Sequence, residues 1–249
     1  MAKIKLYTRN ILESGTVTVT GTPDTGFPES RLYDRSISLF WKDTVTEAKT
    51  FVVDQGASDN LAVDFLAIEK HNFSGADIQW QWSTDNFSAS INDAVTDWTQ
   101  SDNTQITKTL TTALTKRYWR TTLSSMANPK CGEIFMSYGY EFKVRFDNPP
   151  KLMSEANTKW SQTVGGIERS TKFGDKRKVR NYSIFLSTSA ELDNFRAAID
   201  DLDDYSKPFY IKDHEGDYWM CRFQDVPQEE PVTDENAVTV INVSFIEML

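Results

Sequence analysis

The chain has only two cysteines and two histidines among 249 residues, and this scarcity excludes several classes of protein. Cys131 and Cys221 stand far apart, so two buried free thiols are expected rather than a disulfide framework. The sequence also lacks GxGxxG, a Gly-rich loop ending in Gly-Lys-Ser/Thr, HExxH and any CxxC pair. We therefore expect no cofactor, no metal and no catalytic residue.

Long apolar runs and excess positive charge are missing as well. No run approaches the roughly 18 residues that a membrane helix needs, and no apolar stretch follows the basic N-terminus, so no signal peptide is expected. The net charge of −9 argues against a nucleic-acid binder, which usually presents a broad basic face. We expect no membrane and no sequence-specific nucleic acid among the partners.

What the sequence does contain is typical of sheet. Aromatic residues make up 12%, and β-branched residues are frequent, whereas helical periodicity is scarce. In the first 140 residues, alternating patterns predict short strands separated by turns, within the ranges 15–22, 49–56, 61–68, 77–84, 116–125 and 131–140. Strands at this spacing predict a β-sandwich over residues 1–140.

The composition changes near residue 147. Pro149-Pro150 cannot sit in a central strand, so we expect a domain junction within 141–152 and a second domain over 141–249. Thr188 and Glu191 have capping-box spacing at the start of a helix over 188–204 with one apolar stripe. Strands are expected around this helix, in a hairpin at 208–226 and an alternating segment at 237–249.

The histidines do not show the surroundings of a catalytic base. His71 lies between a strand and a Ser-Gly turn, where a histidine easily bonds the backbone, so a structural role is expected. His214 lies in a turn that we expect to be solvated. The same turn offers four metal ligands, Asp213, His214, Glu215 and Asp217, but without the spacing of a known metal loop.

Two tryptophans alternate in "DIQWQWST". Trp80 and Trp82 share one face of the predicted strand with Ile78. They could form a sugar-stacking platform, or they could pack in the core, which is the usual place for large aromatics at period two. We expect the core.

Basic and acidic residues gather in the second domain. The basic group is Arg169, Lys172, Lys176, Arg177, Lys178 and Arg180, and the acidic group on the predicted helix includes Asp200, Asp201 and Asp203. The two groups could pair within the fold, pair between neighbouring copies, or remain two solvated faces. They are the candidates for a subunit interface.

Four segments carry a resemblance to a known family. They are "FPESRLYDRSISLFWK", "DNLAVDFLAIEKHNFSGADIQWQWSTD", "KRYWRTTL" and "CGEIFM", which together cover most of residues 27–136. In order and spacing they resemble discoidin-like (galactose-binding-like) sandwiches of bacteriophage virion proteins. The resemblance implies a jelly-roll β-sandwich in which His71 and Asn72 anchor a turn.

The remainder resembles the ring-forming domain of phage tail-tip and tail-tube proteins. The segments are "GIERSTKFGDKRKVRNYSIFL", the helix, and "PFYIKDHEGDYWMCRFQDV". This resemblance implies a small β-barrel or sandwich with one flanking helix. It further implies a structural protein of a long-tailed phage, not an enzyme, assembled in the host cytoplasm. Its place would be the distal tail, in an often six-fold ring that contacts the tail tube protein and other tail-tip or hub proteins.

Two other function classes stay open. The sandwich could be a carbohydrate-binding module that contacts a host surface glycan, which predicts aromatics in its loops. Tyr33 and Trp98 are the glycan-contact candidates, and Phe40 and Phe87 are further loop aromatics. Alternatively, paired carboxylates could hydrolyse cell-wall glycan, although no acid stands out from a solvated surface.

Overall fold

The computed structural model describes residues 3–58, 60–142, 151–156, 158–172, 174–232 and 239–249. The fold is mainly β, as predicted. It divides into one unit over Tyr7–Gly139 and a second unit made of Tyr140–Leu249 and the N-terminal residues through Leu6. The predicted boundary differs by this short N-terminal segment, where β1 (Lys5–Tyr7) pairs with β12 (Tyr140–Glu141). Pro149-Pro150 lie outside the described residues.

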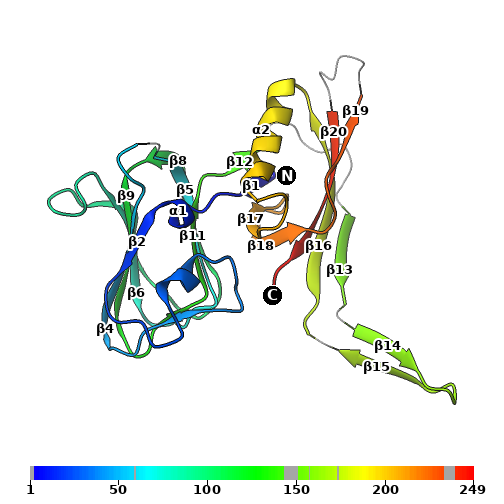
Figure 1. Cartoon of the computed structure of the whole chain (residues 1–249), viewed down its shortest axis with the longest axis horizontal. Coiled ribbons are helices and arrows are strands. Elements are labelled where there is room, and N and C mark those ends of the chain that lie inside the picture. The colour runs from blue at the N-terminus through cyan, green and yellow to red at the C-terminus, as the bar shows by residue number, and fades with distance from the viewer. Residues whose placement is uncertain (1–2, 59, 143–150, 157, 173, 233–238) are drawn as a thin grey trace. The chain divides into compact units, whose positions relative to one another are not determined.

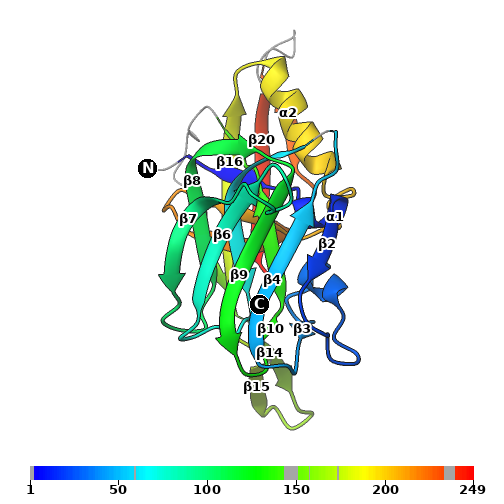
Figure 2. The same ribbon diagram turned by 90° about the vertical axis from the view of Figure 1, so that its left-hand side faces the viewer.

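The first unit is an antiparallel β-sandwich. One sheet has the order β2-β4-β9-β6-β7, and Figure 2 shows these strands side by side. They are β2 (Thr16–Val19), β4 (Glu47–Asp54), β9 (Tyr118–Met126), β6 (Asp77–Ser83) and β7 (Asn92–Thr99). The other sheet contains β11 (Glu133–Ser137), β5 (Ala62–Glu69) and β8 (Ile106–Thr115). Smaller elements complete the unit: α1 (Ile11–Ser14), η1 (Glu29–Leu32), β3 (Trp41–Lys42) and β10 (Lys130–Cys131).

Alternation along the strands fills the space between these sheets. Trp80 and Trp119 are fully buried, with ring centroids 5.4 Å apart, and Trp82 is half-buried against the same core. The core interpretation is therefore confirmed for Trp80, whereas Trp82 lies at the edge of the core with the Lys116 ammonium 4.0 Å from its ring centroid. Cys131 is buried in this core and Cys221 in that of the second unit, and both are free thiols as predicted.

The second unit is built on one sheet of order β12-β1-β17-β18-β20-β16-β13. Its remaining strands are β17 (Phe209–Lys212), β18 (Tyr218–Phe223), β20 (Thr239–Glu247), β16 (Arg177–Leu186) and β13 (Lys151–Glu155), and β19 (Gln228–Pro231) also pairs with β20. The order has two ends, so of the two expected forms, barrel or sandwich, the described strands do not make a closed barrel. The sheet has one apolar face: Ile241, Val243 and Phe245 face the core, while Asn242 and Ser244 bond polar neighbours on the other face.

One helix, α2 (Ser189–Asp200), covers the apolar face of this sheet with Leu192, Phe195 and Ile199. Its start is as predicted, because the Thr188 hydroxyl accepts from the Glu191 N–H and the Glu191 carboxylate accepts from the Ser187 N–H. It ends before residue 204, since the backbone at Asp203, Asp204 and Tyr205 has positive φ. No helix in the described ranges is long and apolar enough to span a membrane.

Candidate assembly interface

A two-stranded arm extends the β13–β16 pair. We call residues 158–172 the arm; it consists of β14 (Thr158–Gln162) and β15 (Glu168–Lys172), drawn as a separate ribbon in Figure 1. The register changes by two residues between the β13–β16 ladder and the arm. The Thr163 N–H donates to Ile167 and the Gly166 N–H to Thr163, which closes the tip. Gly166 has a φ of 78°, which suits glycine in this turn.

The arm exposes apolar side chains on its strands and tip. Trp160 is 68% exposed, Ile167 60%, and Val164 is fully exposed. Every other described arm residue is also exposed, apart from the half-buried Thr158. An isolated two-stranded hairpin is marginally stable in water, and exposed apolar clusters of this kind mark interaction sites. The arm therefore has the properties of a segment that docks on a partner.

The structure separates the six basic candidates into two groups. Arg169 and Lys172 are exposed on the arm, and Lys176 is exposed between the arm and β16. By contrast, Arg177, Lys178 and Arg180 are half-buried on β16. There, Lys178 approaches Asp217 at 3.8 Å and Arg180 pairs with Glu215 at 3.3 Å. The arm cations are thus the ones best placed to meet another chain.

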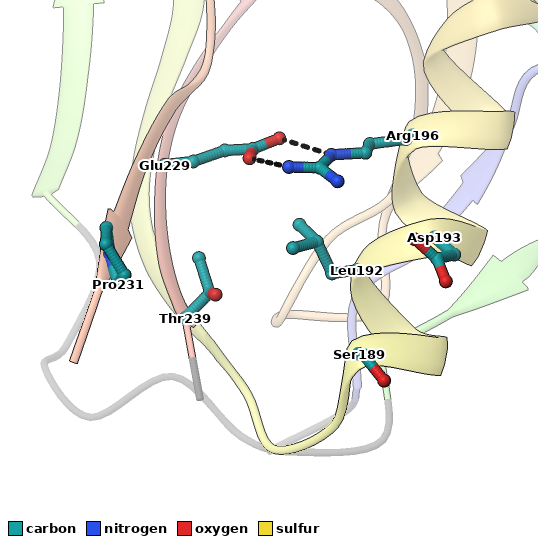
Figure 3. A pocket seen from close by; sticks show the side chains of 7 residues that line it. All are labelled: Ser189, Leu192, Asp193, Arg196, Glu229, Pro231 and Thr239. Carbon is teal, nitrogen blue, oxygen red and sulfur yellow. Dashed lines mark hydrogen bonds and ion pairs between the residues drawn. The ribbon is translucent and has the colours of Figure 1, made fainter. Parts of the chain in front are cut away.

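The acidic candidates lie at the end of α2. Asp200 and Asp203 are exposed, and Asp201 is the half-buried C-cap, whose backbone N–H donates to the Ala197 carbonyl. The same helix borders a groove that sequence reasoning missed. A cavity of about 290 Å³ lies between α2, β19 and the start of β20, lined by Ser189, Leu192, Asp193, Arg196, Glu229, Pro231 and Thr239 (Figure 3).

The two glycan-contact candidates are both half-buried against the sandwich core. Tyr33 follows η1, and Trp98 lies on β7 with the Lys108 ammonium 4.3 Å from its ring centroid. A cation therefore occupies one face of Trp98. The structure instead brings together two loop aromatics, Phe27 and Phe40, which stack at 4.8 Å. Lys42 and Lys130 stand over these rings at 5.7 and 5.8 Å.

His71 is structural, as predicted. Its side chain is buried, and both ring nitrogens are engaged: Nε2 lies 2.6 Å from the Thr104 carbonyl and Nδ1 accepts from the Phe73 N–H at 3.1 Å. These bonds fix a neutral ring with its proton on Nε2. Burial lowers the pKa of His71, against the opposing effects of the Thr104 bond and Asp102.

We expect His71→Ala to lower the free energy of unfolding of the sandwich by about 1–2 kcal/mol, since Phe73 N–H and the Thr104 carbonyl lose their partner. Because the pKa of His71 is lower in the folded protein, the unfolded chain takes up the proton at a higher pH than the folded one does as the pH falls. The stability from His71 is therefore full above pH 6.5 and declines as the pH falls below it. Urea unfolding at pH 7.5 and 5.5 measures both effects. His214→Ala, in the second unit, is the control, and a sandwich transition equally sensitive to it would contradict the assignment.

The other histidine is not a freely solvated turn residue. His214 is half-buried, and its Nδ1 lies 3.0 Å from the Tyr182 hydroxyl. Beside it, Asp213, Glu215 and Asp217 place carboxylate oxygens within 4.8 Å of one another. The buried Asp213 carboxylate already accepts from Trp219 Nε1 and two backbone N–H groups. The Asp213 carboxylate thus stabilises the turn between β17 and β18 through these three hydrogen bonds.

Comparisons with known proteins give matches only among solved structures. No protein-family model matches, and a search of curated proteins finds no match. A GH29 fucosidase of Ruminococcus gnavus is 13% identical over 54% of this chain and 28% of its own, with a TM-score of 0.46. Chitosan-binding module 1 of a Paenibacillus sp. IK-5 chitosanase/glucanase is 19% identical over 52% of this chain and 99% of its own (TM-score 0.44).

A third similar structure is CpGH89CBM32-5 of Clostridium perfringens, solved with GalNAc-beta-1,3-galactose. It is 13% identical over 51% of this chain and 96% of its own, with a TM-score of 0.41. This chain spans under a third of the fucosidase and nearly the full length of the two modules. At these identities and TM-scores, neither an activity nor a ligand carries over to this chain.

Proposed function

We propose that this chain is a non-catalytic structural subunit that assembles with copies of itself, as a ring-forming protein of a long-tailed phage tail tip. The arm carries the proposal. Trp160, Val164 and Ile167 expose apolar surface on a ribbon that no third described strand extends. In a monomer these side chains stay in water, whereas an assembly would bury them.

The proposed docking of the arm on a neighbouring copy is compatible with a ring. An arm that leaves one side of a subunit and docks elsewhere on the next makes a heterologous contact, which closes into a ring when the rotation permits. The phage tail tip itself rests on the resemblance of the second domain to ring-forming tail proteins. The direct test is the mass in solution of the wild type and of a variant without the apolar arm side chains.

A second candidate is glycan binding by the sandwich. The observation that favours it is the stacked Phe27–Phe40 pair with two lysines, because aromatic faces bordered by donors suit a sugar ring. Chitosan oligosaccharides and GalNAc-β-1,3-galactose, the ligands named for the similar modules, supply the probes.

If the sandwich binds a glycan at this pair, Phe40→Ala should weaken binding at least about fivefold in titration calorimetry, since truncating an aromatic that carries a binding contact costs more than about 1 kcal/mol. Ile91→Ala, at an exposed apolar residue of the same unit, is the control. Absence of heat with every probe, or equal binding by Phe40→Ala, counts against this candidate.

A further inference from the structure

The arm and the groove beside α2 lie at opposite ends of one strand. Arg177, the first residue of β16, pairs with Glu155 where the chain enters the arm. Leu186, its last residue, pairs with Thr239, which lines the groove. Ten residues of strand separate the two points, which is about 30 Å at roughly 3.3 Å per residue. Because the arm leaves β16 at the Arg177 end, it points away from its own groove (Figure 1).

The groove is lined by apolar Leu192 and Pro231, by an Arg196–Glu229 ion pair and by one further acid, Asp193. Leu192 points into it from α2, opposite Thr239 and Pro231, as Figure 3 shows. Arg196 and Glu229 form a two-bond ion pair across it, at 3.1 and 2.5 Å. Asp193 lines the groove beside this pair, and further exposed acids lie at the end of α2 and in the turn that follows: Asp200, Asp203 and Asp204.

The arm is the complement of this surface. Its tip is narrow and aliphatic, with Val164 and Ile167 around two glycines. Behind the tip, Lys159, Arg169 and Lys172 outnumber the one acid, Glu168, in a chain whose net charge is −9. A cavity of about 290 Å³ is at the lower limit for a drug-sized ligand, near 300 Å³, and suits a pair of aliphatic side chains.

We propose that the arm tip of one copy inserts into the α2–β19 groove of a second copy, head to tail. This inference rests on the proposed self-assembly and names its docking site. Val164 and Ile167 contact Leu192, while Arg169 and its basic neighbours face Asp193 and the acids of α2. Because each copy offers an arm at one end of β16 and a groove at the other, the contact repeats from subunit to subunit.

Cross-linking between differently tagged copies tests the contact. One copy carries Val164→Cys and the other Ser189→Cys, and both native cysteines are buried. A mixed disulfide should form under mild oxidation at least about tenfold faster than with the control partner Ser88→Cys, an exposed serine of the sandwich. Equal rates for the two partners would overturn the groove assignment.

Charge reversal supplies a second readout. Arg169→Glu and Asp193→Arg should each weaken self-association about tenfold, and mixing or combining the two changes should restore part of it. If the losses simply multiply, these residues do not face each other and the groove assignment fails, although assembly through the arm stands. A wild type that remains a monomer at every concentration overturns both the groove and the proposed function.

Discussion

Lys49→Met should lower the free energy of unfolding of the sandwich by about 3–5 kcal/mol. The Lys49 side chain on β4 is fully buried, and its ammonium donates to Asp43 at 2.8 Å and Glu47 at 2.9 Å. The Asp43 side chain is equally buried. Methionine replaces the aliphatic stem but leaves the Asp43 carboxylate in the interior without its counterion, and this unpaired charge causes the loss. Urea unfolding followed by the fluorescence of the buried tryptophans measures it.

A control separates this buried pair from ordinary surface charges. Arg31→Met breaks the more exposed Arg31–Asp34 pair, at 3.4 Å, and should cost no more than about 1 kcal/mol. The double variant Lys49→Met/Asp43→Leu removes both charges and should recover much of the stability. A Lys49→Met protein as stable as Arg31→Met would contradict the role assigned to the pair.

The stabilisation that the Lys49–Asp43 pair gives to the sandwich depends on pH. Burial alone would raise the pKa of Asp43, but bonds from Lys49 and the Val45 N–H lower it overall. Burial alone would lower the pKa of Lys49, but its two carboxylate partners raise it overall. The acid therefore stabilises the fold above pH 3.8 and the lysine below pH 10.5. This contribution should disappear as the pH falls through the folded pKa of Asp43 or rises through that of Lys49.

Sequence patterns predicted the elements that bury one face. Alternation is clear in β6 and β20, and the Thr188–Glu191 spacing located the start of α2. The same reasoning missed β7 and β8, which lie at the edges of their sheets. Their side chains are half-buried or exposed on both faces, apart from Ile106, so neither strand shows a period of two. A register shift between Val63 and Phe65 further interrupts the pairing with β8.

Contacts between particular side chains and strands could not be predicted from local sequence patterns. β1 joins β12 through Lys5 and Glu141, which no local pattern connects. No sequence pattern marks Lys49 as buried, and only the fold shows Asp43 paired with its ammonium. Gly21 has a φ of 103° and approaches this pair so closely that a Cβ would clash with both side chains. The two strands of the arm were not predicted, because both faces of the arm are exposed and its sequence therefore shows no apolar alternation. Gly165-Gly166 between two short segments is nevertheless a hairpin signal.

Replacing the apolar arm residues should turn an assembly into monomers. The variant is Trp160→Ser, Val164→Ser and Ile167→Thr, which keeps the strands and removes three exposed apolar side chains. Buried at an interface, each is worth more than about 1 kcal/mol, so association should weaken at least about a hundredfold. Sedimentation or mass photometry should then find the 28.5 kDa monomer at concentrations where the wild type associates.

A matched control decides whether the arm is specific. Leu39→Ser, Val45→Ser and Ile91→Ser remove three apolar side chains that are also exposed, but on the sandwich. This control should keep the wild-type mass, and neither variant should change the stability of its own unit by more than about 0.5 kcal/mol, because surface substitutions seldom do. Loss of assembly in the control alone would move the interface to the sandwich. Moderate salt should weaken the wild type if the arm cations contribute, and have little effect if the tip alone holds the subunits together.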